Sequence, residues 1–191
     1  MVEISGKYKI GTRRFGSINW IGAWTLYKKE VLRFLIVWIQ TLFSPLITSL
    51  LFLSVLSLAI GNERGNVLGV PFIVFLAPGL IAMQIIQQAF SHSSSSFMIG
   101  KIKGNIVDLL YAPLSAGEVT LAVTLASVTR SVLIAAISLL VFYLFIDLEI
   151  KNFTTLIIFT LLSAFSLGAL GIIAGLWAEK FDHMATVTNF I

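Results

Sequence analysis

Four long apolar segments dominate the pattern of hydrophobic and polar positions along the chain. They run from Leu35 to Ile60, from Val70 to Phe90, from Val119 to Ile146 and from Phe153 to Ala178. A helix needs about 20 apolar residues to cross the hydrocarbon core of a bilayer, and each segment meets this requirement. The segments are apolar on every side and lack the alternation that barrel strands show. The pattern therefore predicts an all-α membrane protein, a polytopic bundle of four transmembrane helices.

Two shorter segments flank this predicted transmembrane region, which we place at residues 35–191. Residues 181–191 are mildly apolar, and we expect them to open a fifth membrane element. Residues 1–34 form the predicted N-terminal extension, and within it residues 19–34 carry a periodic pattern. Aromatic and apolar residues recur there every three or four positions, which places them on one stripe of a helix. They are Trp20, Trp24, Tyr27, Val31 and Phe34.

The cations Lys29 and Arg33 project from the opposite side of this predicted helix. Tryptophan and tyrosine favour the lipid headgroup zone, and cations favour the anionic inner leaflet. The pattern favours an amphipathic helix that lies along the membrane surface before the chain enters the bilayer. A plain extension of the first transmembrane helix is the alternative.

Composition excludes two large classes of protein. Hydrophobic residues make up 58% of the 191 positions and charged residues 12%. Soluble domains have about 45–50% apolar and about 25% charged residues, and disordered chains are still more polar. A soluble enzyme and a disordered chain are therefore excluded. The chain has no cysteine, so it has no disulfide, thiolate metal site or cysteine nucleophile.

The distribution of basic residues predicts the orientation in the membrane. Most of them lie before the first apolar segment, after the second or after the fourth: Lys7, Lys9, Arg13, Arg14, Lys28, Lys29, Arg33, Lys101, Lys103 and Lys180. Only Arg64 and Lys151 lie in the opposite loops. Because basic loops stay in the cytoplasm, we expect a cytoplasmic N-terminus. The basic residues that give the net charge of +4 lie mostly in the predicted cytoplasmic segments, so the charge reflects orientation in the membrane. We expect no nucleic-acid partner. The first apolar run begins too late and is too long for a secretory signal.

Polar side chains within the apolar segments are candidates for a transport path. Gln84, Gln87, Gln88 and Ser91 share one helix face, which either bonds to another helix or lines a path. Arg130 is the one charge inside a segment, about 16 Å from the cytoplasmic end. With no acid in the other segments, its partners are backbone carbonyls, the glutamines or water. Both a path-facing and a structural role remain open.

The fourth segment has a face of small residues. Gly168, Gly171 and Gly175 lie on one side of the predicted helix, and the last two form a GxxxG pair. Small residues let helix backbones approach closely in lipid. We expect a packing face, either within the subunit or between subunits.

The predicted cytoplasmic loop from Ser91 to Glu118 contains a short amphipathic pattern. Its apolar positions recur every three or four residues and are Ile99, Ile102, Ile106, Leu109 and Pro113. A single short helix with one apolar face suits docking onto another protein. A linker that contacts only lipid is the alternative.

Four motifs in the chain resemble those of the ABC-2 type transporter permeases. They are KEVLRF at 29–34 with WIQTL at 38–42 and Pro45, FLAPGLI at 75–81, SSSF at 94–97 with NIVDLL at 105–110 and APLS at 112–115, and AEKFD at 178–182. The resemblance extends from about Trp24 to the C-terminus. Such permeases are membrane subunits of bacterial inner-membrane exporters, in which two copies pair and each binds a separate ATPase subunit.

The resemblance implies a role for the loop and for its partners. The coupling helix that enters the ATPase would include Gly100, Ile102, Ile106, Asp108, Leu109, Leu110 and Pro113. Residues 19–34 would be the connecting helix, and the cargo would be drug-like, lipid-linked or a polysaccharide. ATP and magnesium would bind the ATPase, and this chain would bind no cofactor. Permeases of this family have six membrane helices, so we expect the chain to be incomplete after Ile191.

Motifs for other chemistry are missing. The sequence has no G-x-x-x-x-G-K-[ST] phosphate loop, and no arrangement of serine, histidine and acid for a hydrolase. His92 and His183 lack companions at metal-ligand spacing, so we expect neither a metal site nor a catalytic residue. One rival hypothesis is an autonomous channel or secondary carrier that uses Arg130 and the glutamine face. Another is a scaffold or membrane-embedded enzyme.

Overall fold

A computed structural model describes residues 18–64, 66–67, 69–146, 148 and 152–190. Several basic residues used to predict the orientation lie outside the described residues: Lys7, Lys9, Arg13, Arg14 and Lys151. Ile191 also lies outside them. The described part is almost entirely helical.

The helices and strands follow one another in this order: α1 (Trp20–Ile36), α2 (Trp38–Arg64), β1 (Asn66–Val67), β2 (Val70–Pro71), α3 (Phe72–Ile102), α4 (Ile106–Tyr111), α5 (Ala116–Phe145), α6 (Phe153–Trp177) and α7 (Phe181–Phe190). Strands β1 and β2 form a minimal antiparallel hairpin, with Val67 opposite Val70. Helices α2, α3, α5 and α6 are long and apolar enough to cross a membrane, which confirms the four predicted transmembrane helices. The structure ends α6 within one residue of its predicted end.

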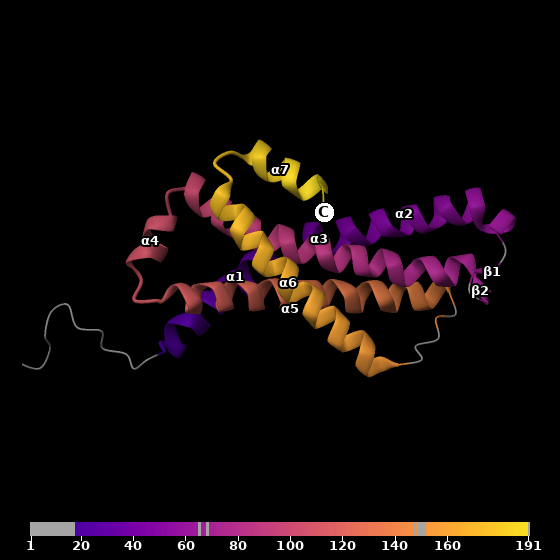
Figure 1. Cartoon of the computed structure of the whole chain (residues 1–191), viewed down its shortest axis with the longest axis horizontal. Coiled ribbons are helices and arrows are strands. Elements are labelled where there is room, and N and C mark those ends of the chain that lie inside the picture. The colour runs from indigo at the N-terminus through magenta and orange to yellow at the C-terminus, as the bar shows by residue number, and fades with distance from the viewer. Residues whose placement is uncertain (1–17, 65, 68, 147, 149–151, 191) are drawn as a thin grey trace, which may run out of the picture.

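Three of the four long helices lie roughly along one axis, and α6 crosses two of them (Figure 1). Helices α2, α3 and α5 run along the long axis, while α6 crosses α3 and α5 obliquely (Figure 1). One end of the bundle carries α4, and the other carries the β hairpin; we name these the α4 end and the hairpin end (Figure 1). Helix α1 packs against α5, and α7 contacts α3 and α6.

Helices α3 and α5 are longer than the bilayer requires. They contain 31 and 30 residues, which is about 45 Å each, whereas about 20 residues cross the hydrocarbon layer. The prediction of a loop from Ser91 onward is therefore wrong over its first part, because α3 continues to Ile102. Within the helix the serine hydroxyls are satisfied by bonding back to preceding carbonyls: Ser95 Oγ donates to the carbonyl of His92 at 3.0 Å.

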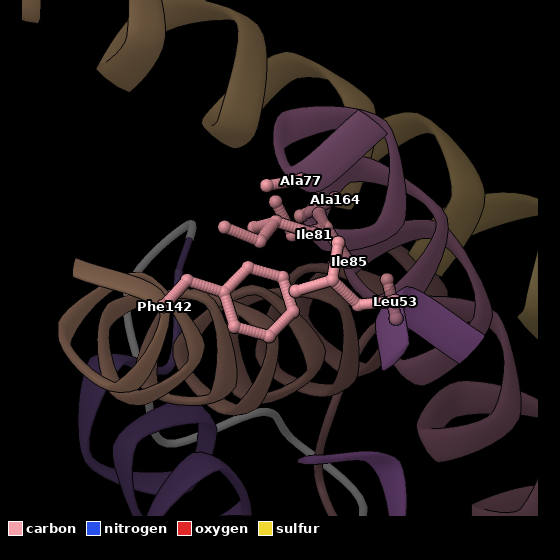
Figure 2. Close-up of a cluster of buried hydrophobic side chains, with 7 residues drawn as sticks. Leu53, Ala77, Ile81, Ile85, Phe142 and Ala164 are labelled. Atoms are coloured by element: carbon pink, nitrogen blue, oxygen red, sulfur yellow. The ribbon is translucent and has the colours of Figure 1, made fainter. Parts of the chain in front are cut away.

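The middle of the bundle is held by an apolar core. Its buried members come from all four long helices and are Leu53, Ala77, Ile81, Ile85, Ala89, Phe142 and Ala164. Figure 2 shows the ring of Phe142 lying against Ile85 and pointing toward the α3 side chains. A second cluster near the α4 end joins α1, α3, α5 and α6 through Leu26, Phe97, Ala122, Val123 and Ile172. The two clusters fix the relative positions of the helices that surround the candidate site.

The glycine face of α6 lies against α3 and α5 of the same chain. A methyl group on Gly171 would lie 2.5 Å from the carbonyl oxygen of Phe90, and one on Gly175 would lie 2.6 Å from that of Ser94. One on Gly168 would meet the hydroxyl of Ser127. The face was expected to pack either within the subunit or between subunits. In the described residues it packs within the subunit.

Helix α1 buries a face that the sequence pattern did not single out. Its buried residues are Leu26, Glu30 and Phe34. Trp20 and Trp24 are 73% and 65% exposed, so most of the aromatic stripe flanks the buried face. Arg33 was predicted to lie opposite the aromatic stripe, and the structure places it between α1 and α3, where its Nη2 donates to the carbonyl of His92 at 3.0 Å. The rotation of α1 that buries Glu30 brings Arg33 inward as well.

Candidate functional site

Helix α4 is a short segment that the chain forms between α3 and α5. Gly104 ends α3 with a φ of +74°, a left-handed conformation that glycine adopts without strain. The prediction of one amphipathic helix through Ile99, Ile102, Ile106, Leu109 and Pro113 is therefore wrong. The first two residues belong to α3, and Pro113 lies beyond α4.

The two sides of α4 have different surroundings. Ile106 and Leu109 are partly buried and pack on the apolar cluster near the α4 end. Leu110 and Tyr111 are 76% and 86% exposed, and Val107 is exposed beside them. Asp108, in the first turn of α4, is also exposed. Of the predicted coupling residues, Leu110 and Asp108 therefore face outward, while Ile106 and Leu109 attach α4 to the bundle.

A buried hydrogen-bond network, which we call the Glu118 junction, joins the segment after α4 to α1 and α5. One carboxylate oxygen of Glu118 accepts from the backbone N–H of Asn19 at 2.5 Å, and the other accepts from that of Ser115 at 2.6 Å. The Asn19 side chain caps α1 and donates to the carbonyl of Pro113 at 3.1 Å. This network was not predicted, although Ser115-x-x-Glu118 in the sequence matches a capping box, which the structure contains.

A lysine links the end of α3 to the end of α6. Lys101 Nζ donates to the carbonyl oxygens of Leu176 and, at 3.1 Å, Ala178. These carbonyls lie at the C-terminus of α6, where a helix carries unpaired acceptors and a partial negative charge. Together with the Glu118 junction, this contact connects the α4 region to four helices.

Titratable side chains of α1, α3 and α5 meet in a polar cluster. Arg130 Nη2 donates to Gln88 Oε1 at 2.6 Å, and its Nη1 lies 3.5 Å from His92 Nδ1. Glu30 Oε2 lies 2.9 Å from Arg33 Nε and 3.8 Å from His92 Nε2. The sequence analysis placed a glutamine among the candidate partners of Arg130. Glu30 and His92 were not among the predicted partners, because the sequence does not reveal that α1 turns Glu30 inward or that His92 lies at the level of Arg130.

Arg130 lies near the middle of α5 (Ala116–Phe145), beside His92 of α3. Arg33, in the last turn of α1, contacts the same histidine, so the three helices meet at this level. The depth of about 16 Å from the cytoplasmic end stays a prediction.

The remaining glutamines have different surroundings. Gln84 is buried, donates to the carbonyl of Pro45 at 3.1 Å and accepts from Ser138 Oγ at 2.7 Å. Gln84 therefore joins α2, α3 and α5 by hydrogen bonds. Of the two alternatives for the glutamine face, bonding to other helices applies to this residue. Gln87 is partly buried on α3, and the structure does not bring it to the cavity beside Gln88.

A polar cavity of about 490 Å³ lies beside the cluster, between α1, α2, α3 and α5. Three cationic side chains line it, namely Arg33, Lys103 and Arg130. Its other polar lining includes Gln40, Thr41, Gln88, Ser91, His92 and Ser95. Within the described residues no three acidic or histidine side chains come close enough to hold a metal ion. The arrangement suits the binding of a charged group.

Comparison with known proteins agrees with this architecture. Residues 22–191 match the family described as ABC-2 type transporter. The chain is 27% identical over 174 residues to the "Inner membrane transport permease YadH" of Escherichia coli (strain K12), which covers 91% of this chain and 68% of that protein. The proteins of the same name from Escherichia coli O157:H7 and Shigella flexneri match equally well. No solved structure matches. With four membrane-spanning helices and a family match over most of its length, the chain belongs to the ABC-2 type transporter family and is a multi-pass transport permease of the inner membrane.

Proposed function

We propose that this permease is the membrane subunit of an ATP-driven exporter, and that a separate ATPase subunit docks on α4. The arrangement of α4 is the observation that carries the proposal. Val107, Leu110 and Tyr111 form an exposed apolar surface, whereas Ile106 and Leu109 fasten the same helix to the bundle. A force applied to α4 therefore reaches α1 and α5 through the Glu118 junction, and α3 and α6 through Lys101.

The charges at the α4 end support a cytoplasmic position for it. Lys28, Lys29, Lys101 and Lys103 all lie there, and basic residues concentrate in cytoplasmic segments. In this orientation α4 meets a cytoplasmic ATPase. The ATPase binds ATP and magnesium, and this chain binds no cofactor. ATP-driven closure of the ATPase pair would push α4 and tilt the long helices, opening a path outward.

A second copy of the chain completes the proposed path. Large apolar side chains along α2 stay exposed, among them Leu51 and Leu58. Such a surface suits lipid or the matching surface of a second permease. The cargo is a drug-like, lipid-linked or polysaccharide molecule. Gln88 and Arg130, the two candidate path residues that line the polar cavity, are the side chains that would contact it.

The double variant Asp108→Lys with Leu110→Glu tests the docking role of α4. Both side chains are exposed, so the change leaves the core intact. Burying an unpaired charge in an interface costs several kcal/mol, so we expect co-purification of the ATPase subunit to fall about tenfold or more. ATP-dependent transport into inverted vesicles should fall in parallel.

Lys180→Glu is the matched control, because this residue is exposed and changes charge outside α4. It should leave co-purification and transport unchanged. Unchanged co-purification in the double variant would refute docking on α4. Transport by the purified chain without ATP or a partner would instead favour the alternative function, an autonomous channel or secondary carrier.

A further inference from the structure

The polar cavity between α1, α2, α3 and α5 carries more positive than negative charge. Arg33, Lys103 and Arg130 line it, whereas no carboxylate lines it among the described residues, and that of Glu30 pairs with Arg33 and Lys29. In the part of the chain that the structure describes, Arg130 has no ion pair. Its hydrogen-bond partners, Gln88 and His92, are an amide and an imidazole.

The guanidinium of Arg130 is prepared to bind an anion. Gln88 and His92 hold it in place, yet its Nε is buried and has no hydrogen-bond partner among the described residues. A buried charge without a counter-ion is costly, and arginine binds phosphate through two parallel N–H donors. An anion in the cavity would offset this cost. The second cation, Lys103, is exposed at the mouth and reaches the anion as a mobile point charge.

The walls of the cavity indicate what carries the anion. Besides the polar groups, apolar side chains of α1, α2 and α3 and of the α1–α2 junction line it, namely Phe34, Val37, Pro45 and Ile99. The cavity lies at the α1–α2 junction, next to the start of α2 at Trp38, which is the first residue of a candidate membrane span. A head group can therefore contact the cations while its hydrocarbon chain continues along apolar surface.

We propose that this cavity binds the phosphate of a membrane amphiphile from the leaflet at the α4 end. Arg130 and Lys103 bind the phosphate oxygens, Gln88 orients Arg130, and the acyl chains lie along α2. This lipid-phosphate site does not depend on ATP or on docking at α4, so it can fail or hold independently of the proposed function.

Lipid titration of the purified 191-residue chain tests the proposal. Phosphatidylglycerol and phosphatidylcholine with the same acyl chains are compared by native mass spectrometry and by the thermal unfolding of the protein in detergent. Glycerol 1-phosphate and inorganic phosphate form the soluble arm. We expect phosphatidylglycerol to bind about tenfold more tightly than phosphatidylcholine, and the soluble anions to bind more weakly than the lipid.

Three variants identify the site. Arg130→Gln should weaken phosphatidylglycerol binding about tenfold, and Lys103→Gln about threefold, since an exposed cation contributes less. Lys29→Gln is the control, because this lysine is 66% exposed and does not line the cavity. Its affinity should equal that of the unchanged chain. Lys103→Gln keeps the test decisive if Arg130→Gln does not fold, because Lys103 is exposed.

Three results would overturn the proposal. Equal binding of the two lipids would remove the requirement for a phosphate anion. If Lys29→Gln weakened phosphatidylglycerol binding as much as Lys103→Gln does, the lipid would be attracted by surface charge in general. Binding of inorganic phosphate as tight as that of phosphatidylglycerol would assign the cavity to a soluble anion.

Discussion

The approach of α6 to α3 predicts that identical substitutions at different glycines have opposite effects on stability. We consider Gly175→Ala and Gly171→Ala, each of which adds one methyl group. At these positions the new carbon would lie 2.6 Å and 2.5 Å from backbone carbonyl oxygens of α3, whereas ordinary contacts begin at 3.4 Å. At Gly79, on the same bundle, the new carbon would have no atom within 4 Å.

The magnitude follows from the shortfall of about 0.8 Å at Gly175. The atoms in conflict belong to two helix backbones, so only a separation of α3 from α6 relieves the overlap. A gap of this size removes a quarter to a half of the dispersion energy at the contact, and overpacking costs about 1–3 kcal/mol. Gly79→Ala removes only the conformational freedom of glycine in the unfolded chain and should stabilise by about 0.5–1 kcal/mol.

Unfolding of the purified protein in mixed detergent micelles measures this difference. Increasing sodium dodecyl sulfate unfolds the helix bundle, and tryptophan fluorescence follows the transition. Gly171→Ala and Gly175→Ala should each lower the free energy of unfolding by about 2 kcal/mol, while Gly79→Ala should raise it.

Gly168→Ala adds an internal check. Its methyl group would meet the side-chain hydroxyl of Ser127 rather than backbone. Removing that hydroxyl with Ser127→Ala should therefore recover part of the loss, and the two substitutions should couple in a double-mutant cycle. If Gly175→Ala were as stable as Gly79→Ala, the close approach of α3 and α6 would be refuted.

Three further predictions use the same unfolding assay. Glu118→Ala removes the carboxylate that caps the starts of α1 and α5 and should cost about 2–4 kcal/mol, whereas the exposed Glu179→Ala should change stability by less than about 0.5 kcal/mol. Lys101→Met should cost about 1 kcal/mol and speed amide hydrogen exchange at the end of α6, and Lys103→Met should do neither. Gln84→Leu leaves a buried hydroxyl of α5 without its acceptor and should cost about 1–2 kcal/mol; no loss would mean that the interhelical bonds contribute nothing.

The four membrane helices were predictable because length and hydropathy decide them locally. The fourth was predicted at 153–178, and α6 ends at Trp177. The extension of α3 beyond Phe90 was not predictable in this way. Its serines look like a loop in the sequence, but the glycines of α6 leave room for them in a packed interface, which is a non-local effect.

The candidate site was predictable only in part. The absence of acids from the other spans left backbone carbonyls, the glutamines or water as partners of Arg130, and in the structure Gln88 accepts a hydrogen bond from it. The involvement of Glu30 depends on the rotation of α1 about its axis, which the aromatic stripe did not reveal. The capping box at Ser115 and Glu118 could be predicted from the sequence. The second donor to the Glu118 carboxylate, the backbone N–H of Asn19, is distant in sequence and could not.

The shared carboxylate of Glu118 has a consequence for how the bundle moves. The bond from the Ser115 N–H to Glu118 lies within the first turn of α5, so it survives when α1 moves. The bonds that cross to α1 both come from Asn19, whose backbone N–H reaches Glu118 and whose side chain reaches the Pro113 carbonyl. The start of α1 should therefore hinge away from α5 at Asn19 while the start of α5 remains capped.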